Sequence, residues 1–320
     1  MNQKITDAII KKTKIPNLIN LLVNRLSFGE LQSLLLKIFE LKTAKKDNSI
    51  ILKEYQSSRF AQPSDVNPVV HRKLELMIFS LLPDDFKLIE LSPLTPIGTT
   101  SILTPIHQNN VVSTIRNMEV AADTTNILAL ECAKRRKIQL KKDRKNLHPI
   151  KLCSSQRLFR GQPFENKNFS AHFNVVALCT AGKDEGNDKF EMINLEEHIL
   201  FYINLLDKIM VEKDVKHINI KFFEYGEFDN TGLIENIMEK FSHREKIRFK
   251  NEKNSEFGKN YYTRLRFMIS VVDQGNQEFD YIDGGFTDWT SGLLSNNKER
   301  LLTSGIGTDF LLRTIQIKPQ

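Results

Sequence analysis

The chain has 320 residues, of which 40% are hydrophobic and 27% charged, with a formal net charge of +7. This composition is typical of a soluble globular protein with a large core, and the length allows one or two domains. The sequence has no apolar run of membrane-spanning length, and residues 1–14 are too polar and lysine-rich for a signal peptide. We therefore expect a soluble, cytoplasmic protein.

Three cysteines, Cys132, Cys153 and Cys179, form an odd and unpatterned set. We interpret them as buried thiols in a reducing compartment. The seven histidines show no ligand spacing with cysteines or carboxylates, so we expect no metal site.

The first 60 residues are predicted to form a separate helical segment. Ser27 and Glu30 have the spacing of a capping box, and apolar residues then recur at helical spacing to Phe39. A preceding helix is predicted over residues 15–25. Short amphipathic helices need a partner surface, so we expect them to pack on the main domain, with a protein partner as the alternative.

The main domain is predicted to occupy residues 61–320, after a polar linker over residues 57–68. The pattern predicts helices over residues 69–82, 124–137, 194–212 and 232–241, and a last helix that includes residues 311–315. Strands are predicted over residues 86–91, 111–120, 217–222 and 261–272, with a turn at Gly284-Gly285. Asp123 occupies the cap position of the second helix.

Positive charge is densest at the end of that second helix, in Lys134, Arg135, Arg136, Lys137, Lys141, Lys142, Arg144 and Lys145. One interpretation is a weak, sequence-independent RNA footprint. The other is a solvated helix end, which the lack of interleaved aromatic residues favours.

The central stretch from Cys153 to Gly182 is predicted to form two strands joined by a long loop. Arg160 stands where the first strand ends, a position that suits an anionic ligand because guanidinium binds carboxylate or phosphate bidentately. Because the helices and strands lack a βαβ rhythm, the fold class is predicted to be α+β on a largely antiparallel sheet.

Phe159 to Pro163 reads Phe-Arg-x-Gln-Pro, and a loop separates it from His172-Phe173-Asn174. This pattern resembles motif 2 of the class II aminoacyl-tRNA synthetases in its histidyl form, Phe-Arg-x-Glu followed by a loop and Phe-x-Gln. The resemblance implies the antiparallel synthetase fold.

Other motifs of the histidyl-tRNA synthetase catalytic domain follow in order between about residues 66 and 316. The helix over residues 69–82 and the strand that ends at Pro93 resemble the dimer-forming motif 1. Residues 120–125 resemble Leu-Arg-Pro-Glu-Gly-Thr, whose acid and threonine, here Asp123 and Thr125, contact the substrate amino group. The remaining matches are residues 258–263 to the histidine-specific Gly-Leu-Asp-Tyr-Tyr-Thr, residues 284–288 to Gly-Gly-Arg-Tyr-Asp, and residues 305–311 to motif 3, Gly-x-Glu-Arg-Leu.

The departures from the family pattern bear on activity. Phe310 stands at the motif 3 arginine that binds the ATP γ-phosphate, and Phe257 at the arginine that promotes adenylate formation. Gln162 replaces an acid that helps hold ATP, and Leu178 replaces the side-chain-recognising glutamate. Loss of one preorganised donor costs about 10²–10³ in rate. The sequence also ends soon after motif 3, so we expect no anticodon-binding domain.

The leading hypothesis is a histidyl-tRNA synthetase-like paralog that has lost ATP activation and binds an amino-acid-like molecule, as a regulatory or binding subunit and a homodimer. This is similar in kind to the regulatory subunit of ATP phosphoribosyltransferase. It predicts no catalytic residue and the ligand-binding residues Asp123, Thr125, Arg160, Gln162, Asn174, Tyr261, Tyr262, Gly284, Gly285 and Gly307.

Two alternatives stay open. One is an adenylate-forming amino-acid ligase with an acceptor other than tRNA, which alone would require ATP and Mg²⁺. The other is an RNA-binding or purely structural dimer. Each retained residue also has a structural interpretation: Asp123 as a helix cap, the tyrosines and Trp289 as core, and the glycines as a turn or a close backbone approach.

Overall fold

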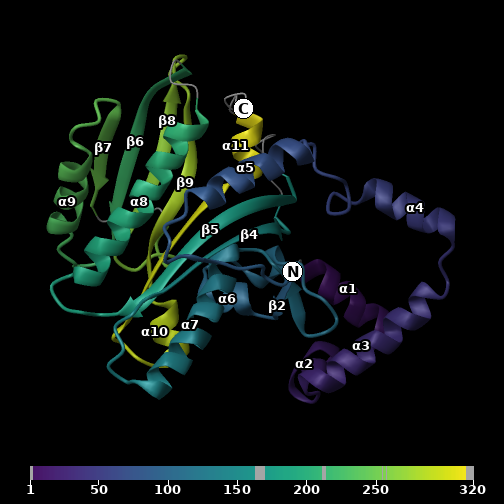
Figure 1. Cartoon of the computed structure of the whole chain (residues 1–320). Helices are drawn as coiled ribbons and strands as arrows, with labels where there is room; N and C mark the ends of the chain where they lie inside the picture. The colour runs from purple at the N-terminus through teal and green to yellow at the C-terminus, as the bar shows by residue number, and fades with distance from the viewer. Residues whose placement is uncertain (1–2, 163–169, 211–213, 254, 257, 315–320) are drawn as a thin grey trace.

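The computed structural model describes residues 3–162, 170–210, 214–253, 255–256 and 258–314. Within these ranges, an eight-stranded sheet forms the centre of the molecule (Figure 1). In their order across the sheet, the strands are β1 (Lys87–Leu88), β4 (Ile150–Phe159), β5 (His172–Lys183), β10 (Glu299–Gly307), β9 (Glu278–Thr287), β8 (Leu265–Asp273), β6 (Val215–Glu224) and β7 (Ile247–Glu252).

The sheet is antiparallel except at its two edges, where β1 pairs with β4 and β6 pairs with β7 in parallel. The predicted α+β fold on a largely antiparallel sheet is therefore confirmed. β4 and β5 pair from Ile150↔Ala181 to Phe159↔His172, and this long hairpin carries the predicted central stretch.

Helices cover both faces of the sheet, so its central strands are apolar on both sides. Val176 and Leu178 of β5 pack with α8 (Lys189–Ile209), whereas Ala177 and Cys179 pack with α7 (Thr124–Lys142). This alternation follows from the two-residue period of a strand. α9 (Thr231–Phe241) and α5 (Pro68–Ser80) add to the α8 side, and α10 (Trp289–Leu294) packs with α7.

All three cysteines are buried and free, which confirms the prediction of buried thiols. Burial raises the pKa of the Cys153 thiol to about 12. In the described part of the chain, no helix is both long and apolar enough to cross a membrane.

Several local predictions need correction. Tyr261 and Tyr262 precede β8 instead of lying on it, and Gly284 and Gly285 lie inside β9 and form no turn. The strand predicted over residues 111–120 shrinks to β3 (Met118–Val120), which pairs with β2 (Leu94–Pro96). A short helix, α6 (Thr99–Leu103), lies beside α7, and α11 (Thr308–Thr314) follows β10.

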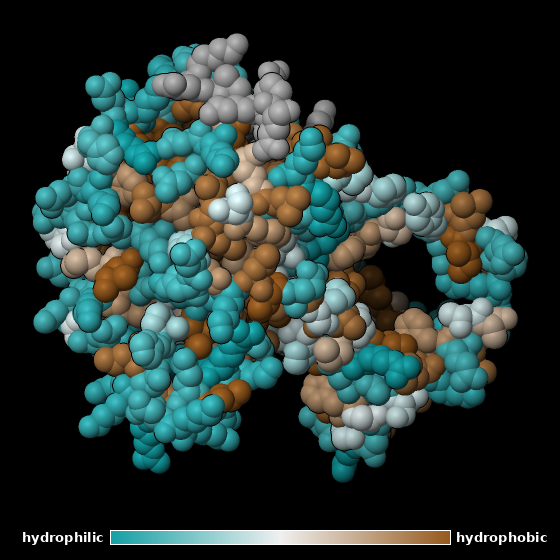
Figure 2. Space-filling model, in the orientation of Figure 1, coloured by the Kyte–Doolittle hydropathy of each residue, from teal (hydrophilic) through white to brown (hydrophobic). Residues whose placement is uncertain are grey.

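The N-terminal segment forms α1 (Gln3–Thr13), α2 (Leu18–Asn24), α3 (Phe28–Thr43) and α4 (Asn48–Ser57), and Ser27 and Glu30 make the predicted capping box. None of these helices contains a buried residue, which differs from the expected packing on the main domain. Figure 1 shows α3 and α4 standing away from the sheet, and Figure 2 shows apolar residues on their surface.

Candidate functional site

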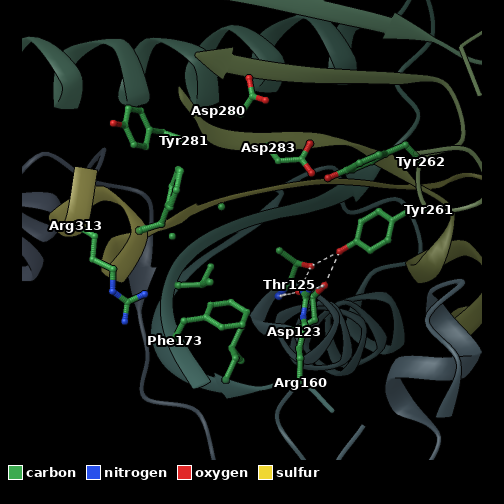
Figure 3. Close-up of a pocket in the computed structure, with 15 residues that line it drawn as sticks. Asp123, Thr125, Arg160, Phe173, Tyr261, Tyr262, Asp280, Tyr281, Asp283 and Arg313 are labelled. Carbon is green, nitrogen blue, oxygen red and sulfur yellow. Dashed lines mark hydrogen bonds and ion pairs between the residues drawn. The ribbon is translucent and has the colours of Figure 1, made fainter. Parts of the chain in front are cut away.

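A cavity of about 280 Å³ lies beside the sheet, where β4, β5, β9 and β10 meet the start of α7 and the loop before β8 (Figure 3). Six of the ten predicted ligand-binding residues line it. They are Asp123, Thr125, Arg160, Tyr261, Tyr262 and Gly307. Residues that are far apart in the sequence thus meet at one concave site.

Asp123 is both the cap of α7 and a wall of the cavity. Its Oδ1 accepts hydrogen bonds from the backbone N of Thr125 at 2.9 Å and from the Thr125 hydroxyl at 2.7 Å. Its Oδ2 accepts a 2.8 Å hydrogen bond from the hydroxyl of Tyr261. The capping role and the place in the cavity are therefore compatible, because each uses a different carboxylate oxygen.

Arg160 places a cation next to this carboxylate. Its Nε donates to the carbonyl oxygen of Ala122 at 3.1 Å, its guanidinium lies 5.5 Å from the centre of the Phe173 ring, and its Nη2 lies 3.9 Å from Oδ2 of Asp123. The side chain keeps 26% of its surface exposed. An anion and a cation thus lie side by side at this end of the cavity.

The two tyrosines form an aromatic wall. Their ring centres are 4.7 Å apart, and the buried Trp289 packs edge-on against Tyr261 at 5.2 Å. Burial, together with the nearby carboxylates, holds the pKa of both tyrosines well above its usual value, so both hydroxyls stay protonated. Gly285 makes room for this wall, since a Cβ there would lie 2.6 Å from Cδ1 of Tyr262.

Two acids of β9, Asp280 and Asp283, also line the cavity, although neither was predicted as a site residue. Residues three apart on a regular strand point to opposite faces. The pairing of β8 with β9 shifts register between Ile269 and Ser270, which skips Tyr281 and brings both acids to the same face. The alternation of apolar and polar residues along a strand does not indicate where such a bulge lies.

Asp283 contacts Arg266, whose Nε lies 2.7 Å and whose Nη2 lies 3.2 Å from its oxygens. Burial raises the pKa of Asp283, and Arg266 and the Tyr262 hydroxyl act against that rise. Asp280 behaves differently. Burial also acts to raise its pKa, but hydrogen bonds from Lys221 and Ser270 prevail and lower it.

Four predicted residues do not line this cavity. Asn174 faces the other side of β5, where its Nδ2 donates to Glu75 at 3.2 Å. Gln162 contributes its backbone oxygen to Arg59. Gly284 and Gly285 lie in the strand behind the cavity, where Phe267 and Tyr262 approach closely.

Leu178 is fully buried in the core on the α8 face of the sheet. It does not line the cavity either. Two sequence features fall outside the described residues: Phe257, and the loop over residues 163–169 that begins with Pro163.

No protein-family model and no curated protein matches this sequence. Solved structures do. The apo histidyl-tRNA synthetase of S. aureus is 15% identical and superposes with a TM-score of 0.57 over 80% of this chain and 70% of that one. An ATP phosphoribosyltransferase regulatory subunit/histidyl-tRNA synthetase from Bacillus halodurans is 11% identical, with a TM-score of 0.58 over 80% and 83%. The histidyl-tRNA synthetase of Nostoc sp. PCC 7120 gives 11% identity and a TM-score of 0.55 over 80% and 74%.

This chain has the histidyl-tRNA synthetase-like fold. The predicted resemblance to the class II synthetase catalytic domain is therefore confirmed for the fold. At 11–15% identity, the likeness is one of fold alone.

Phe310, which the sequence resemblance matched to the motif 3 arginine, lines the cavity and packs 5.6 Å from the Tyr281 ring. Arg313, one turn further along α11, lines it as well and contacts Asp65 at 2.6 Å. A phenylalanine supplies no charge, so the cations that reach this cavity from the described residues are Arg160 and Arg313.

A larger cavity of about 960 Å³ lies between α5 and the β1–β4 edge of the fold. Its polar walls include His71, Glu75, Gln156, Arg157 and His172. His71 contacts the Thr308 hydroxyl at 2.9 Å, and burial lowers the pKa of its imidazole. In the described chain, no group of three or more His, Cys, Asp or Glu side chains is arranged to hold a metal ion.

The basic run around the end of α7 is only partly a surface feature. Arg136 is fully buried and forms an ion pair with Glu299 at 2.8 Å. Lys134 and Arg135 both pair with Glu131. The remaining lysines and Arg144 are at least partly exposed, so the positive surface is smaller than the sequence indicates.

Proposed function

We propose that this chain is a histidyl-tRNA synthetase-like paralog that binds an amino-acid-like small molecule in the 280 Å³ cavity and acts as a regulatory or binding subunit. The observation that carries the proposal is that Phe310 lines the cavity, because the sequence resemblance matches this residue to the ATP-binding arginine of motif 3. A ring that offers no positive charge is a poor partner for a γ-phosphate. The similar fold of the Bacillus halodurans ATP phosphoribosyltransferase regulatory subunit/histidyl-tRNA synthetase supports the same class of role.

The head of the ligand would bind between Asp123 and Arg160. The ammonium and carboxylate of an α-amino acid are attached to the same carbon, so they need an anion and a cation close together. Oδ2 of Asp123 and Nη2 of Arg160 are 3.9 Å apart, which matches this need. Thr125 and Tyr261 hold the Asp123 carboxylate in place through both of its oxygens.

Ligand binding and adenylate formation can be tested separately. Native mass spectrometry of the purified protein would identify a co-purifying ligand, and a thermal-shift screen of the common amino acids would find the one that binds. We expect a shift with an amino acid, and no amino-acid-dependent pyrophosphate exchange. Robust exchange would overturn the loss of ATP activation, and a cavity that binds no amino acid would overturn the proposal as a whole.

The second candidate is an adenylate-forming ligase with an acceptor other than tRNA. Arg313 favours it, because this guanidinium lines the cavity one helical turn after Phe310. Under this reading, the arginine that contacts ATP has moved along α11, and ATP with Mg²⁺ would bind. Pyrophosphate exchange that is lost in Arg313→Ala but kept in Arg116→Ala, which changes an arginine outside the cavity, would support it.

We also propose a homodimer formed through the motif 1-like helix. α5 keeps Val69, Val70 and Leu76 exposed, and Leu88 of the edge strand β1 is exposed nearby. The apolar surface of α1–α4 supports a further partner protein at residues 1–60. Its exposed large residues are Ile5, Ile9, Ile15, Ile19, Leu21, Val23, Phe28, Leu34, Ile38, Phe39, Leu41, Ile50, Ile51, Leu52 and Tyr55.

A further inference from the structure

The end of the cavity away from Arg160 is acidic. Asp283 and Asp280 face it from β9, across from Asp123 and Arg160 (Figure 3). Their side chains remain 48% and 49% exposed although both residues are in the sheet. Their cationic partners, Arg266 and Lys221, do not line the cavity. A ligand therefore meets carboxylate oxygens at this end.

Asp283 is the better placed of the two acids. Arg266 holds it from the side away from the cavity with two N–H groups, which fixes the direction of the carboxylate. The arginine is itself held over the rings of Phe223 and Tyr262, at 5.3 and 5.6 Å. A carboxylate has room for about four hydrogen bonds, so acceptor capacity is left for a ligand. A second cation would pair with this carboxylate through a charge-assisted hydrogen bond, which is stronger than a neutral one.

The rest of the cavity is apolar apart from Arg313, which forms an ion pair with Asp65. Phe173 and Val175 line it from β5, and Tyr281 and Phe310 line it from β9 and α11. A ligand that fills the site therefore needs a charged head at Asp123 and Arg160, an apolar stem, and a cation at the far end. The head, the stem and the terminal cation of the ligand would thus each contact a different group of lining residues.

We infer that the cavity selects an α-amino acid whose side chain ends in an ammonium or guanidinium group, and that Asp283 is the residue that recognises this group. The inference rests on the proposed function. An imidazole is a weaker match, because at an ordinary pKa of about 6.5 it is mostly neutral at pH 7. Leu178, which the sequence resemblance matched to the family's side-chain-recognising glutamate, lies in the core on the other face of the sheet and has no part in this recognition.

The test measures the affinities of lysine, arginine, histidine, norleucine and cadaverine by isothermal titration calorimetry. Norleucine keeps the head and the stem of lysine without its charge, and cadaverine keeps the second cation without the carboxylate. We expect lysine or arginine to bind at least about tenfold more tightly than norleucine and histidine. Asp283→Asn should remove this preference and leave norleucine binding within about twofold.

The possible failures are distinguishable. If norleucine binds as tightly as lysine, or if Asp283→Asn keeps the preference, the inference is wrong while the proposed function stands. If histidine is preferred over lysine and arginine, the inference is wrong as well. If cadaverine matches lysine, the amino-acid head is wrong and with it the proposed function. If none of the amino acids binds, both fail.

Asp283→Asn leaves the Arg266 guanidinium buried beside a neutral group, so its fold needs a check. Thermal melting without ligand provides this check. The double variant Asp283→Asn/Arg266→Met removes both charges together, and it should also lose the preference for a cationic side chain. Asp288→Asn is the matched control, because this exposed acid lies five residues further on and outside the cavity. It should retain the full preference.

Discussion

The hydroxyl of Tyr261 donates a 2.8 Å hydrogen bond to Oδ2 of Asp123, across 138 residues of sequence. This bond joins the loop before β8 to the first turn of α7. The other carboxylate oxygen, Oδ1, accepts from the backbone and side chain of Thr125. One side chain thus caps a helix and forms a wall of the cavity, and suitable substitutions separate these two roles.

Asp123→Ser should keep the helix cap but lose the carboxylate, because serine is also a good N-cap residue. Asp123→Ala loses both and should be about 1 kcal/mol less stable than Asp123→Ser in urea unfolding. Both variants should lose the thermal shift given by the cavity ligand. If Asp123→Ser keeps the full shift, Asp123 is a cap only and the head of the ligand binds elsewhere.

Gly284→Ala should destabilise the fold, because a Cβ at this position of β9 would lie 2.6 Å from the Phe267 ring and from Cβ of Ser304. Overpacking of this kind costs about 1–3 kcal/mol. Gly232→Ala is the matched control: nothing lies within 4 Å of a Cβ there, and alanine favours the helix α9. Urea denaturation should show a loss for the first variant and none for the second. Equal stabilities would argue against the close approach in β9.

Local signals in the sequence were reliable where a few neighbouring residues decide the structure. The Ser27–Glu30 capping box and the Asp123 cap depend on contacts within three residues, and both form as predicted. The contact between Asp123 and Arg160 cannot be predicted from the residues next to either one in the sequence. It was accessible only through the family resemblance, which placed both residues on a known fold.

Features that depend on distant residues could not be predicted. Arg136 reads as part of a basic surface, but Glu299, 163 residues away, pairs with it inside the protein. Asp280 and Asp283 would lie on opposite faces of a regular strand, and the register shift between β8 and β9 brings them to the same face. The exposure of the apolar residues of α3 was not predicted, because an apolar stripe shows that a helix can pack on another surface but does not identify that surface.

His198 makes the stability of the fold sensitive to acid. It is fully buried between Thr180 and Ser304, and burial, with a smaller effect of Lys151, lowers its pKa to about 3. The unfolded chain, with an ordinary histidine pKa of about 6.5, binds the proton first. The stabilising effect is therefore complete above about pH 6.5 and is lost as the pH falls from there towards 3.

Between pH 7 and pH 5, this single group should lower the free energy of unfolding by about 2 kcal/mol. The free energy of unfolding of His198→Gln should therefore fall by about 2 kcal/mol less than that of the wild-type protein over the same interval. This difference does not depend on how stable the variant is at pH 7. Urea unfolding of both proteins at several pH values gives the two slopes. His71, which also has a lowered pKa, is present in both proteins, so its effect cancels in the difference. Identical slopes would mean that His198 is not buried in its neutral form.

Leu76→Glu should dissociate the proposed homodimer without unfolding the chain. Leu76 lies on α5 with 68% of its surface exposed, beside the exposed Val69 and Val70 on the same helix. In a two-fold interface, each substitution acts twice, because the same patch is present on both subunits. A buried glutamate without a partner carries a large desolvation cost, so the dimer should become a monomer at micromolar concentration.

Light scattering or analytical ultracentrifugation gives the mass of the particle in solution. Ile193→Glu, on the exposed side of α8, is the control that should stay dimeric. A wild-type monomer, or a dimer unaffected by Leu76→Glu, would place the interface elsewhere or remove it.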